Sequence, residues 1–356
     1  MSNFVIHSYN TVMITAKFGG TAITPHNLVY LKKILTPSHK VVVVSAIGKS
    51  HPNDVKTTDL LASYFNTGNE QIWQTVCNRY QKLVHVNCIN VDVEQLLADA
   101  HNRALSYNLD YCLSLGEELS AKIVSAYLGA TYVEAQDVVV FGKGGLCVSQ
   151  TLSRMKRAFF GEKLAVIGGF YGGHANGRKT FSRGGSDVTA SFCAVTNGSA
   201  LCENWTDANG VCQGNPAEIF GVKTLTHLGY NQMFQLAQAG ATVLHPDAVK
   251  PLQDFGIPLV VGNFYNPNGQ KTFVSNHPNR QKLLCVTQKL HNDNFVVTVV
   301  HNMLQVQVFT RLGNLYKLLE QQTPNPIQSV SCCANTITIV SFGNILQQVF
   351  DSFACV

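Results

Sequence analysis

The chain has 356 residues, of which 46% are hydrophobic and 13% are charged, and its net charge is +5. This composition can bury enough apolar surface to offset chain entropy, so it excludes an intrinsically disordered protein, and the length predicts about two domains. The basic residues are scattered, which argues against nucleic-acid binding, and no apolar stretch approaches the roughly 20 residues that cross a bilayer.

The eleven cysteines include no Cys-x-x-Cys pair, so the sequence predicts neither a disulfide framework nor a metal cage of Cys and His. The first sixteen residues lack a basic start, and polar residues such as His7 interrupt their apolar run. We therefore expect no signal peptide, free thiols in a reducing compartment, and a cytoplasmic location.

Short apolar runs alternate with longer helical patterns through about residue 275, which predicts an α/β layered domain. The run Val41–Val44 is continuously apolar, as in a strand that is buried on both faces of a largely parallel sheet. The other predicted strands are Val12–Ala16, Ala165–Gly168, Ser199–Cys202 and Leu259–Val261. The spacing of apolar residues predicts helices at Gln95–Leu105, Glu117–Leu128, Val188–Val195 and Tyr230–Ala239. Gly129 and Gly240 are the expected ends of two of these helices.

The composition shifts to Asn, Pro and Gly between Asn263 and Arg280, and a smaller α+β pattern follows. Its predicted elements are a strand at Phe295–Val300, a helix at Leu312–Gln321, two strands within Ile327–Ser341 around a turn at Asn335, and a helix at Ile345–Phe353. We place the boundary between a larger domain, residues 1–278, and a smaller one, residues 279–356.

The segment Lys17–Thr21, with the sequence Lys-Phe-Gly-Gly-Thr, directly follows a predicted strand. Its lysine is therefore expected at a carboxyl edge of the sheet, where open α/β sheets bind ligands. Glycine N–H groups can approach phosphate oxygens there, and an ammonium can neutralise charge on a transferring group. A Gly-Gly turn with a surface lysine is the alternative interpretation.

The segment Gly48–Ser50 is similar to the end of a P-loop, but Val43 stands where that motif requires glycine, so a Walker A loop is excluded. The hydroxyls of Ser45 and Ser50 follow a buried strand and are either ligand contacts or ordinary turn residues. Glu117 is expected to open the helix that runs to Leu128. Its carboxylate would there either stabilise the helix dipole or bind an ammonium group.

The loop Arg183–Asp187, with the sequence Arg-Gly-Gly-Ser-Asp, precedes the predicted helix Val188–Val195, and Ser186 or Asp187 is its expected N-cap. Arginine can bind a carboxylate through two hydrogen bonds, glycines allow close approach, and N–H groups at a helix start bind anions. A hydrated hairpin turn is the alternative.

Thr206 and Asp207 follow another apolar strand and offer a hydroxyl and a carboxylate, which suit a ribose or a Mg²⁺-phosphate shell unless they form a simple β-turn. No catalytic triad, His-Glu-x-x-His motif or catalytic carboxylate pair is recognisable. A kinase whose acceptor is a carboxylate needs none of these, because its acceptor oxygen is already ionised at neutral pH.

These motifs occur in an informative order: Lys17–Thr21, Val44–Lys49, Leu115–Glu117, Gly169–Gly172, Ser182–Ala190, Trp205–Val211 and Gly240–Pro246. Together they resemble the aspartate kinase (aspartokinase) branch of the amino-acid kinase family, from about residue 12 to residue 275. The tail from about residue 282 resembles one ACT-type regulatory module. Aspartokinases commonly carry two such modules, so we expect a reduced regulatory domain.

The resemblance implies ATP- and Mg²⁺-dependent phosphorylation of the β-carboxylate of L-aspartate to 4-phospho-L-aspartate, the first step toward lysine, threonine and methionine. It implies Lys17 and Asp187 as catalytic residues, with Arg183 binding a substrate carboxylate and Asp187 the substrate ammonium. The implied aspartate site comprises Ser45, Ser50, Glu117, Arg183, Gly184, Gly185 and Ser186. The implied ATP contacts are Lys17, Phe18, Gly19, Gly20, Thr206, Asp207, Cys212, Thr242 and Val243. It also implies a homo-oligomer that forms through the C-terminal domain, and an amino-acid effector.

The chain departs from the family pattern at several positions. Cys212 and Ala217 replace a tyrosine and an arginine near ATP, and Thr242 and Ala22 replace a lysine and a serine. The helix that usually bears a glutamate begins Tyr-Asn-Gln232. A lost charge-assisted hydrogen bond costs roughly 1.5–3 kcal/mol, so we expect weakened ATP binding. Two alternatives follow: a weakly active or inactive relative that acts as a binding or regulatory protein, or a kinase for another amino-acid carboxylate, such as glutamate or N-acetylglutamate.

Overall fold

The computed structural model describes residues 12–51, 53–182, 184–241, 244–281, 283–291, 293–303, 305–319 and 326–354. The chain divides into two compact units, of which the first ends at Trp205 and the second begins at Thr206. The domain boundary that the sequence suggests, between residues 278 and 279, is a different division and stays a prediction.

The first unit is built on a sheet of parallel strands in the order β9-β1-β2-β6-β3. These strands are β1 (Ile14–Phe18), β2 (His39–Val44), β3 (Thr131–Val133), β6 (Ala165–Gly168) and β9 (Leu201–Thr206). Val41–Val44 have no exposed surface, which confirms a strand covered on both faces. Two short antiparallel hairpins accompany the sheet: β4 (Phe141–Gly142) with β5 (Gly145–Leu146), and β7 (Tyr171–His174) with β8 (Gly177–Thr180).

The strands of this sheet end in register at one edge. Phe18 at the end of β1 lies opposite Val44 and Trp205, and Val44 lies opposite Gly168. The chain proceeds from β1 to β2 on one side, and β9 later adds to the other side of β1. Open α/β sheets bind ligands where the strand order reverses in this way, so the end of β1 is the expected ligand position.

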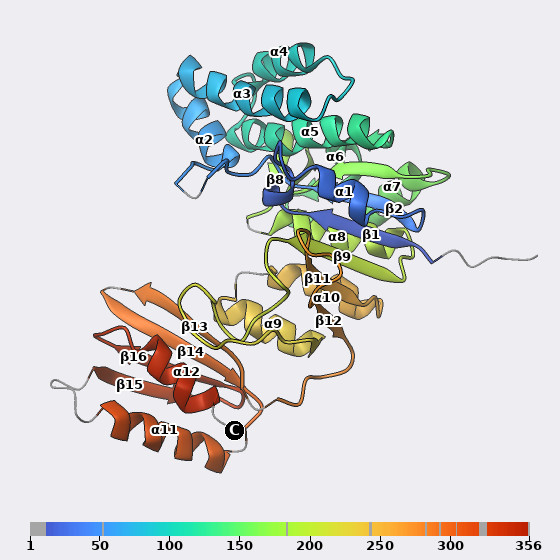
Figure 1. Cartoon of the computed structure of the whole chain (residues 1–356). Coiled ribbons are helices and arrows are strands. Elements are labelled where there is room, and N and C mark those ends of the chain that lie inside the picture. Colours follow the sequence, from blue (N-terminus) through green and yellow to red (C-terminus); the bar gives the residue numbers. More distant parts are fainter. Residues whose placement is uncertain are drawn as a thin grey trace, which may run out of the picture. The chain divides into compact units, whose positions relative to one another are not determined.

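Helices cover this sheet. In Figure 1 the helices α2 to α5 gather on one side of the strands, and α5 packs against β2 and β6 while α8 packs against β1 and β2. The helical elements are the 3₁₀ turn η1 (Gly20–Ala22), α1 (Val29–Ile34), α2 (Thr57–Thr67), α3 (Glu70–Val86), α4 (Val93–Ala104), α5 (Leu109–Leu128), α6 (Ala135–Val138), α7 (Val148–Phe159) and α8 (Gly185–Thr196). Among the described residues, none of the helices has both the length and the apolar character to cross a lipid bilayer.

The start of α5 differs from the sequence prediction. The helix begins at Leu109, where the side chain of Asn108 accepts a hydrogen bond from the Tyr111 amide, so the expected start at Glu117 is wrong. Gly116 is not a helix boundary. It lies within the helix, and glycine is needed at this position because a Cβ would come within 2.8 Å of the Ala46 methyl group. The end of the helix is as predicted, with Gly129 in the left-handed conformation.

The second unit contains a mixed segment and a separate antiparallel sheet. In the mixed segment β12 (Thr272–Ser275) pairs parallel with β10 (His227–Gly229) and antiparallel with β11 (Leu259–Asn263), and α9 (Tyr230–Ala239) and α10 (Pro246–Asp254) lie between these strands in the sequence. The antiparallel sheet has the order β13-β14-β16-β15. Its strands are β13 (Leu283–His291), β14 (Asn294–His301), β15 (Ile327–Cys332) and β16 (Thr336–Ser341), and its helices are α11 (Gln305–Leu319) and α12 (Leu346–Ala354).

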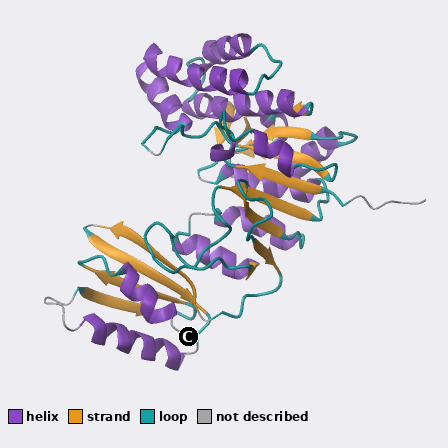
Figure 2. Cartoon of the chain, in the orientation of Figure 1, coloured by secondary structure: helices purple, strands orange, loops and turns teal. Residues whose placement is uncertain are grey.

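Alternation along β14 and β16 gives the antiparallel sheet two different faces. Val297 and Val299 of β14 and Ile339 of β16 belong to the apolar core formed with α11 and α12, which lie together against the sheet in Figure 2. The intervening residues Thr298 and Thr338 line a groove of about 570 Å³ beside α9. The expected α+β character of the tail is confirmed, although the sequence prediction missed β13, whose polar residues break the apolar pattern.

Candidate active site

Lys17 and Asp187 meet at the ligand edge of the sheet in the first unit. Lys17 is the next-to-last residue of β1, and its Nζ lies 2.7 Å from Oδ1 of Asp187 in the first turn of α8. Both side chains are mostly buried, with 13% and 12% of their surface exposed. Asn204 of β9 also donates a hydrogen bond to this carboxylate oxygen, at 3.3 Å. A cation and an anion that the sequence separates widely therefore share one position.

The loops that follow β1 and β2 touch through their backbones. A Cβ on Gly20 would lie 2.8 Å from the carbonyl oxygen of Ala46, and a Cβ on Gly48 would overlap the carbonyl group of Gly20. The Gly19 amide donates to the carbonyl of Trp205, which fixes the start of the same loop. The glycines are therefore needed here for close approach rather than for turn flexibility alone.

The start of α8 is joined to the loops after β2 and β6. The hydroxyl of Ser45 donates to the hydroxyl of Ser186 at 3.1 Å, and a Cβ on Gly169 would lie 2.5 Å from the Ser186 Cα. The ends of β1, β2 and β6 therefore converge on the first turn of α8 within the first unit. This is the arrangement that the glycine-rich motifs indicate.

The N-cap of α8 is Gly184, not Ser186 or Asp187. Gly184 adopts the left-handed conformation with a φ of 59°, and its carbonyl accepts hydrogen bonds from the amides of Asp187 and Val188. The side chains that the sequence suggests as caps have other partners, since Asp187 binds Lys17. Gly185 is required because a Cβ there would lie 2.7 Å from the Phe170 Cα.

Arg183 lies outside the described residues, as do Thr242 and Val243. Their predicted contacts with substrate and nucleotide stay predictions. The flanks of Arg183 are nevertheless fixed, because Phe181 donates its amide to the carbonyl of Phe170, and Gly184 begins the cap of α8.

Glu117 is a buried carboxyl in the third turn of α5, with 4% of the residue exposed. It accepts a hydrogen bond from the backbone amide of Ala46, in the loop after β2, and its Oε2 has no hydrogen-bond partner among the described residues. Burial raises the pKa of Glu117 to about 8, since hydrogen bonds from the backbone of Ala46 and of Glu117 itself compensate only part of the lost hydration. The site therefore contains a carboxyl oxygen that can accept one more donor.

Ser50 lies apart from Ser45 and Glu117 in its contacts. It is exposed, its amide donates to Asp54 at 2.7 Å, and it lines a pocket of about 250 Å³ next to Gly48. The ion pair between Asp54 and the buried Arg79 borders the same pocket, with Nη2 to Oδ1 at 2.6 Å. Ser50 is thus close to the glycine loop, and its amide is bonded to Asp54.

Three of the residues predicted for the nucleotide, Thr206, Asp207 and Cys212, lie at the start of the second unit. The hydroxyl of Thr206 donates to Asp207 at 3.1 Å, and Asp207 is exposed. Cys212 is half-buried and forms an isolated β-bridge with Thr224. Gln213, next to Cys212, accepts a backbone hydrogen bond from Val286 of β13.

Sequence reasoning missed Asn204 as a site residue. It is buried in β9, and its amide oxygen has no hydrogen-bond partner in the described part of the chain, although its Nδ2 reaches Asp187. Asn204 lies two residues after the apolar Cys202, on the same face of the strand, and a polar amide at that alternate position is the signal that could have identified it, because buried polar groups need partners.

Comparison with known proteins places these features in a family. The model of the amino acid kinase family matches residues 13–263. Aspartokinase 3 of Bacillus subtilis is 32% identical over 288 residues, which cover 74% of this chain and 63% of that protein. The chain thus spans about three fifths of the length of curated relatives such as this one.

Solved structures share the fold. The crystal structure of Clostridium acetobutylicum aspartate kinase aligns with a TM-score of 0.79 and 21% identity, covering 96% of this chain and all of that one. A crystal structure of Escherichia coli aspartokinase III in complex with aspartate and ADP aligns with a TM-score of 0.70 and 19% identity, covering 96% of this chain and 83% of that one. The predicted fold, a mostly parallel layered sheet with a smaller ACT-like α+β region, is confirmed.

Proposed function

Because the chain belongs to the amino acid kinase family, we propose that it transfers the γ-phosphoryl group of ATP to the β-carboxylate of L-aspartate, giving 4-phospho-L-aspartate. The contact of 2.7 Å between Lys17 and Asp187, beside interlocked glycine loops, carries the proposal. The similarity to proteins named aspartokinase, one of them solved with aspartate and ADP, supports the choice of substrate.

The proposed reaction needs charge neutralisation and positioning rather than proton transfer. A carboxylate oxygen of the acceptor bonds to the γ-phosphorus, the bond from that phosphorus to the β,γ-bridging oxygen breaks, and ADP leaves with the electron pair. The acceptor is ionised already, so no general base is required. Lys17 is placed to neutralise the negative charge that moves during transfer, and Asp187 holds its ammonium in place.

We propose that Glu117, together with Asp187, binds the acceptor's ammonium group. Its unpartnered Oε2 is an acceptor without a donor, and a substrate ammonium would supply both a donor and a positive charge. A nearby positive charge lowers the pKa of a carboxyl, so binding would convert Glu117 from its largely neutral form to the carboxylate. We further propose that Arg183 binds a carboxylate of the acceptor and that Ser45, Gly184, Gly185 and Ser186 line its site.

In the first unit we propose that Gly19 and Gly20 bind a phosphate group. Gly19 lies beside the ammonium of Lys17, since a Cβ there would be in van der Waals contact with Nζ at 3.8 Å. In the second unit we propose Thr206 and Asp207 for the nucleotide, because their exposed oxygen atoms suit a ribose or Mg²⁺. When it is bound, Mg²⁺ neutralises phosphate charge. Phe18, Cys212, Thr242 and Val243 complete the proposed nucleotide contacts.

A second candidate function is that of a binding or regulatory protein with weak or absent catalysis. The structure favours it at one point: the segment that carries Cys212 is bonded to β13 through Gln213 and Val286, rather than being an open loop. Cys212 and the exposed Ala217 also lack the aromatic and guanidinium groups that the family uses near ATP. Phosphoryl transfer remains the preferred function, because Lys17 and Asp187 are in contact.

The amino-acid effector and the homo-oligomer are proposals of the same rank. The groove of about 570 Å³ beside α9 is lined by amides, hydroxyls, Lys289 and His291 together with the apolar Ala239, Leu290 and Val296, which suit a small amphipathic ligand such as an amino acid. A thermal-shift screen with lysine, threonine and methionine tests the effector proposal, and the absence of any shift would count against it.

A hydroxamate assay with MgATP tests the proposed function. We expect product with L-aspartate, little or none with glutamate or N-acetylglutamate, and a fall in kcat of about 100- to 1000-fold in Lys17→Ala. Lys163→Ala is the matched control, since Lys163 is exposed and is not part of the described site. Nucleotide binding by calorimetry without any acyl phosphate product would replace the kinase with the second candidate.

A further inference from the structure

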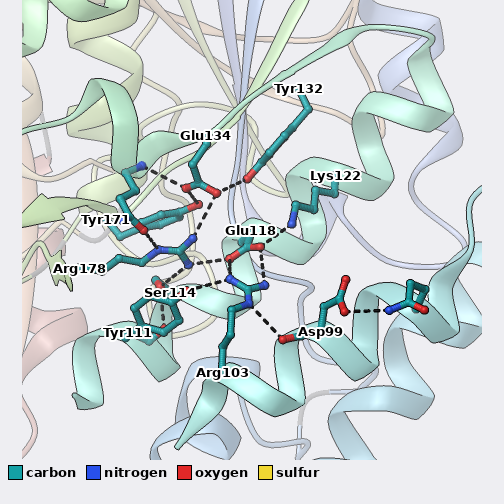
Figure 3. A network of polar contacts seen from close by, with 12 residues as sticks. Asp99, Arg103, Tyr111, Ser114, Glu118, Lys122, Tyr132, Glu134, Tyr171 and Arg178 are labelled. Atoms are coloured by element: carbon teal, nitrogen blue, oxygen red, sulfur yellow. Dashed lines mark hydrogen bonds and ion pairs between the residues drawn. The ribbon is translucent and has the colours of Figure 1, made fainter. Parts of the chain in front are cut away.

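Glu118, the neighbour of Glu117 on α5, is the centre of a buried charge network. It is 1% exposed, and its carboxylate binds Arg103 at 2.8 Å, Lys122 at 2.6 Å and Arg178 at 2.6 Å. Figure 3 shows the three cationic side chains directed at it from different segments. Burial alone would raise the pKa of Glu118, but its hydrogen bonds and the charges around it outweigh burial and bring the pKa to about 2. Glu118 is therefore a permanent anion.

Arg178 is the member of this network that comes from β8. Its Nη1 donates to Glu118 and, at 3.0 Å, to Ser114, its Nη2 donates to Glu134 at 3.1 Å, and its Nε donates to Gln136 at 2.8 Å. Every nitrogen of the guanidinium thus has a partner, and two carboxylates balance its charge. A planar group with this many fixed donors defines an orientation, which a single point charge could not.

Aromatic rings hold the same guanidinium in place. Its central carbon lies 4.5 Å from the centre of the Tyr111 ring and 4.7 Å from the centre of the Tyr171 ring. Tyr111 belongs to α5 and Tyr171 to β7, so the contact ties the hairpin β7–β8 to the helix. Figure 3 shows Arg178 and both rings in this corner of the network. Such cation–π contacts are strongest where water is excluded.

The hairpin leads directly into the candidate active site. After Arg178, the hydroxyl of Thr180 donates to Asp110 of α5, and the Phe181 amide donates to the carbonyl of Phe170. The chain then passes through Gly184 into α8, whose first turn carries Asp187. The stem of the hairpin is therefore fixed to α5 before the loop that presents α8 begins.

Neighbouring residues of α5 thus fix two different loops. Glu117 receives the amide of Ala46 in the loop after β2, and Glu118 holds Arg178 in the hairpin before α8. Because α5 is a rigid helix, its adjacent carboxyls define the separation of the two loops. The loops carry Ser45 on one side and Gly184 on the other, both proposed for the acceptor.

We propose that Arg178 is a positioning residue. Anchored by Glu118, it holds the loop before α8 in the position that binding of the amino-acid acceptor requires. The acceptor is named here on the basis of the proposed function. Arg178 does not touch the reacting atoms; it acts through the hairpin. Loss of Arg178 leaves Glu118 paired with Arg103 and Lys122, so the buried carboxylate stays neutralised. The hairpin loses its buried contact with Glu118 and keeps the contacts of Lys179 and Thr180 with Asp110.

The test compares Arg178→Met with Lys122→Met. Both variants remove one cation from Glu118, but Lys122 lies on α5 itself, at i+4, and does not reach the hairpin. We expect Arg178→Met to raise the KM for aspartate about tenfold with kcat changed less than about threefold, and Lys122→Met to change neither. Arg178→Lys keeps one charge but loses the planar fork, so it should restore part of the affinity.

Hydrogen exchange supplies a readout that does not depend on catalysis. The peptide that covers residues 180–188 should exchange faster in Arg178→Met than in Lys122→Met or the wild type, and Arg178→Lys should lie between, which also serves if the methionine variant does not fold. Equal exchange or equal KM values in the two methionine variants would overturn the proposal. If the wild type makes no acyl phosphate but residues 180–188 still exchange faster in Arg178→Met, the positioning role is supported and the proposed function is overturned instead.

Discussion

The two units of the chain differ in how closely their motif positions follow the family pattern and in what those positions contact. In the first unit the motif glycines are held by backbone contacts, as at Gly20 and Gly48, and the motif charges are held by each other, as at Lys17 and Asp187. In the second unit the motif positions Cys212 and Ala217 have changed side chains, and the backbone there bonds to β13. The glycines of the first unit meet a steric demand of the fold, whereas we propose that a ligand alone constrains the positions of Cys212 and Ala217.

Gly48→Ala tests the steric half of this comparison and should have the largest effect. The new methyl group would overlap the carbonyl of Gly20, so the two loops must separate, and we expect a loss of about 3 kcal/mol in the free energy of unfolding. Urea denaturation measures it. Gly144→Ala is the control, because a Cβ there meets nothing within 4 Å. Equal stability of the two variants would show that the loops are not interlocked.

Glu117→Gln tests the electrostatics of the first unit. The pKa of this acid is raised from 4.5 to about 8 in the folded chain, so between these values the unfolded state is ionised and the folded state is not. Stability from this group is therefore complete below pH 4.5 and declines as the pH rises through 8. Between pH 5 and pH 8 the wild type should lose on the order of 4 kcal/mol of unfolding free energy relative to Glu117→Gln, by urea denaturation, since each pH unit between the two pKa values is worth about 1.4 kcal/mol. A pH-independent difference would contradict the buried, neutral carboxyl.

Gln232→Glu asks whether a departure in the second unit has acquired a structural role. The Gln232 amide accepts from the Gly229 amide and donates to the carbonyl of Asn279 at 2.8 Å. A glutamate cannot donate, so restoring the family residue should cost about 1–2 kcal/mol of unfolding free energy. Gln238→Glu is the matched control on the exposed side of α9. An unchanged melting temperature for Gln232→Glu would show that the position is free.

Ala217→Arg tests the ligand half of the comparison and should have the smallest effect on stability. The residue is exposed, so the longer side chain can be accommodated. If the family arginine contacts phosphate, the variant should lower the Kd for MgATP about threefold to tenfold by calorimetry, since charge-assisted hydrogen bonds are worth more than neutral ones. Ala217→Gln, which adds a shorter polar side chain without charge, should leave the Kd unchanged. Equal affinities in both variants would remove this position from the nucleotide site.

Much of the fold could be predicted from the sequence because its strands and helix ends depend on residues that are close together in the chain. The apolar runs located β2, β6 and β11, and helix ends at Gly129 and Gly240 were as expected, each in the left-handed conformation. The prediction of where α5 begins was wrong because Gly116 resembles a helix boundary in sequence. Glycine stands there because of the close contact with Ala46, a residue distant along the chain.

The candidate site could be predicted only in part, for a related reason. The order of the motifs indicated Lys17 and Asp187 as site residues. Their contact depends on strand register, which could not be predicted from the sequence. Asn204 and Arg178 belong to no motif that we recognised, since their importance comes from partners far away in sequence. The roles of the site residues in binding stay predictions, including those of Arg183, Thr242 and Val243.

The meshing of Gly20 with Gly48 has a consequence for motion. Because each backbone fills the space where the other's side chain would be, neither loop can move toward the other, and the Gly48 amide also donates a hydrogen bond to the carbonyl of Ile23. We therefore expect a displacement of one loop to shift the other. If the two loops bind the nucleotide and the acceptor as proposed, occupancy of one site would alter the geometry of the other.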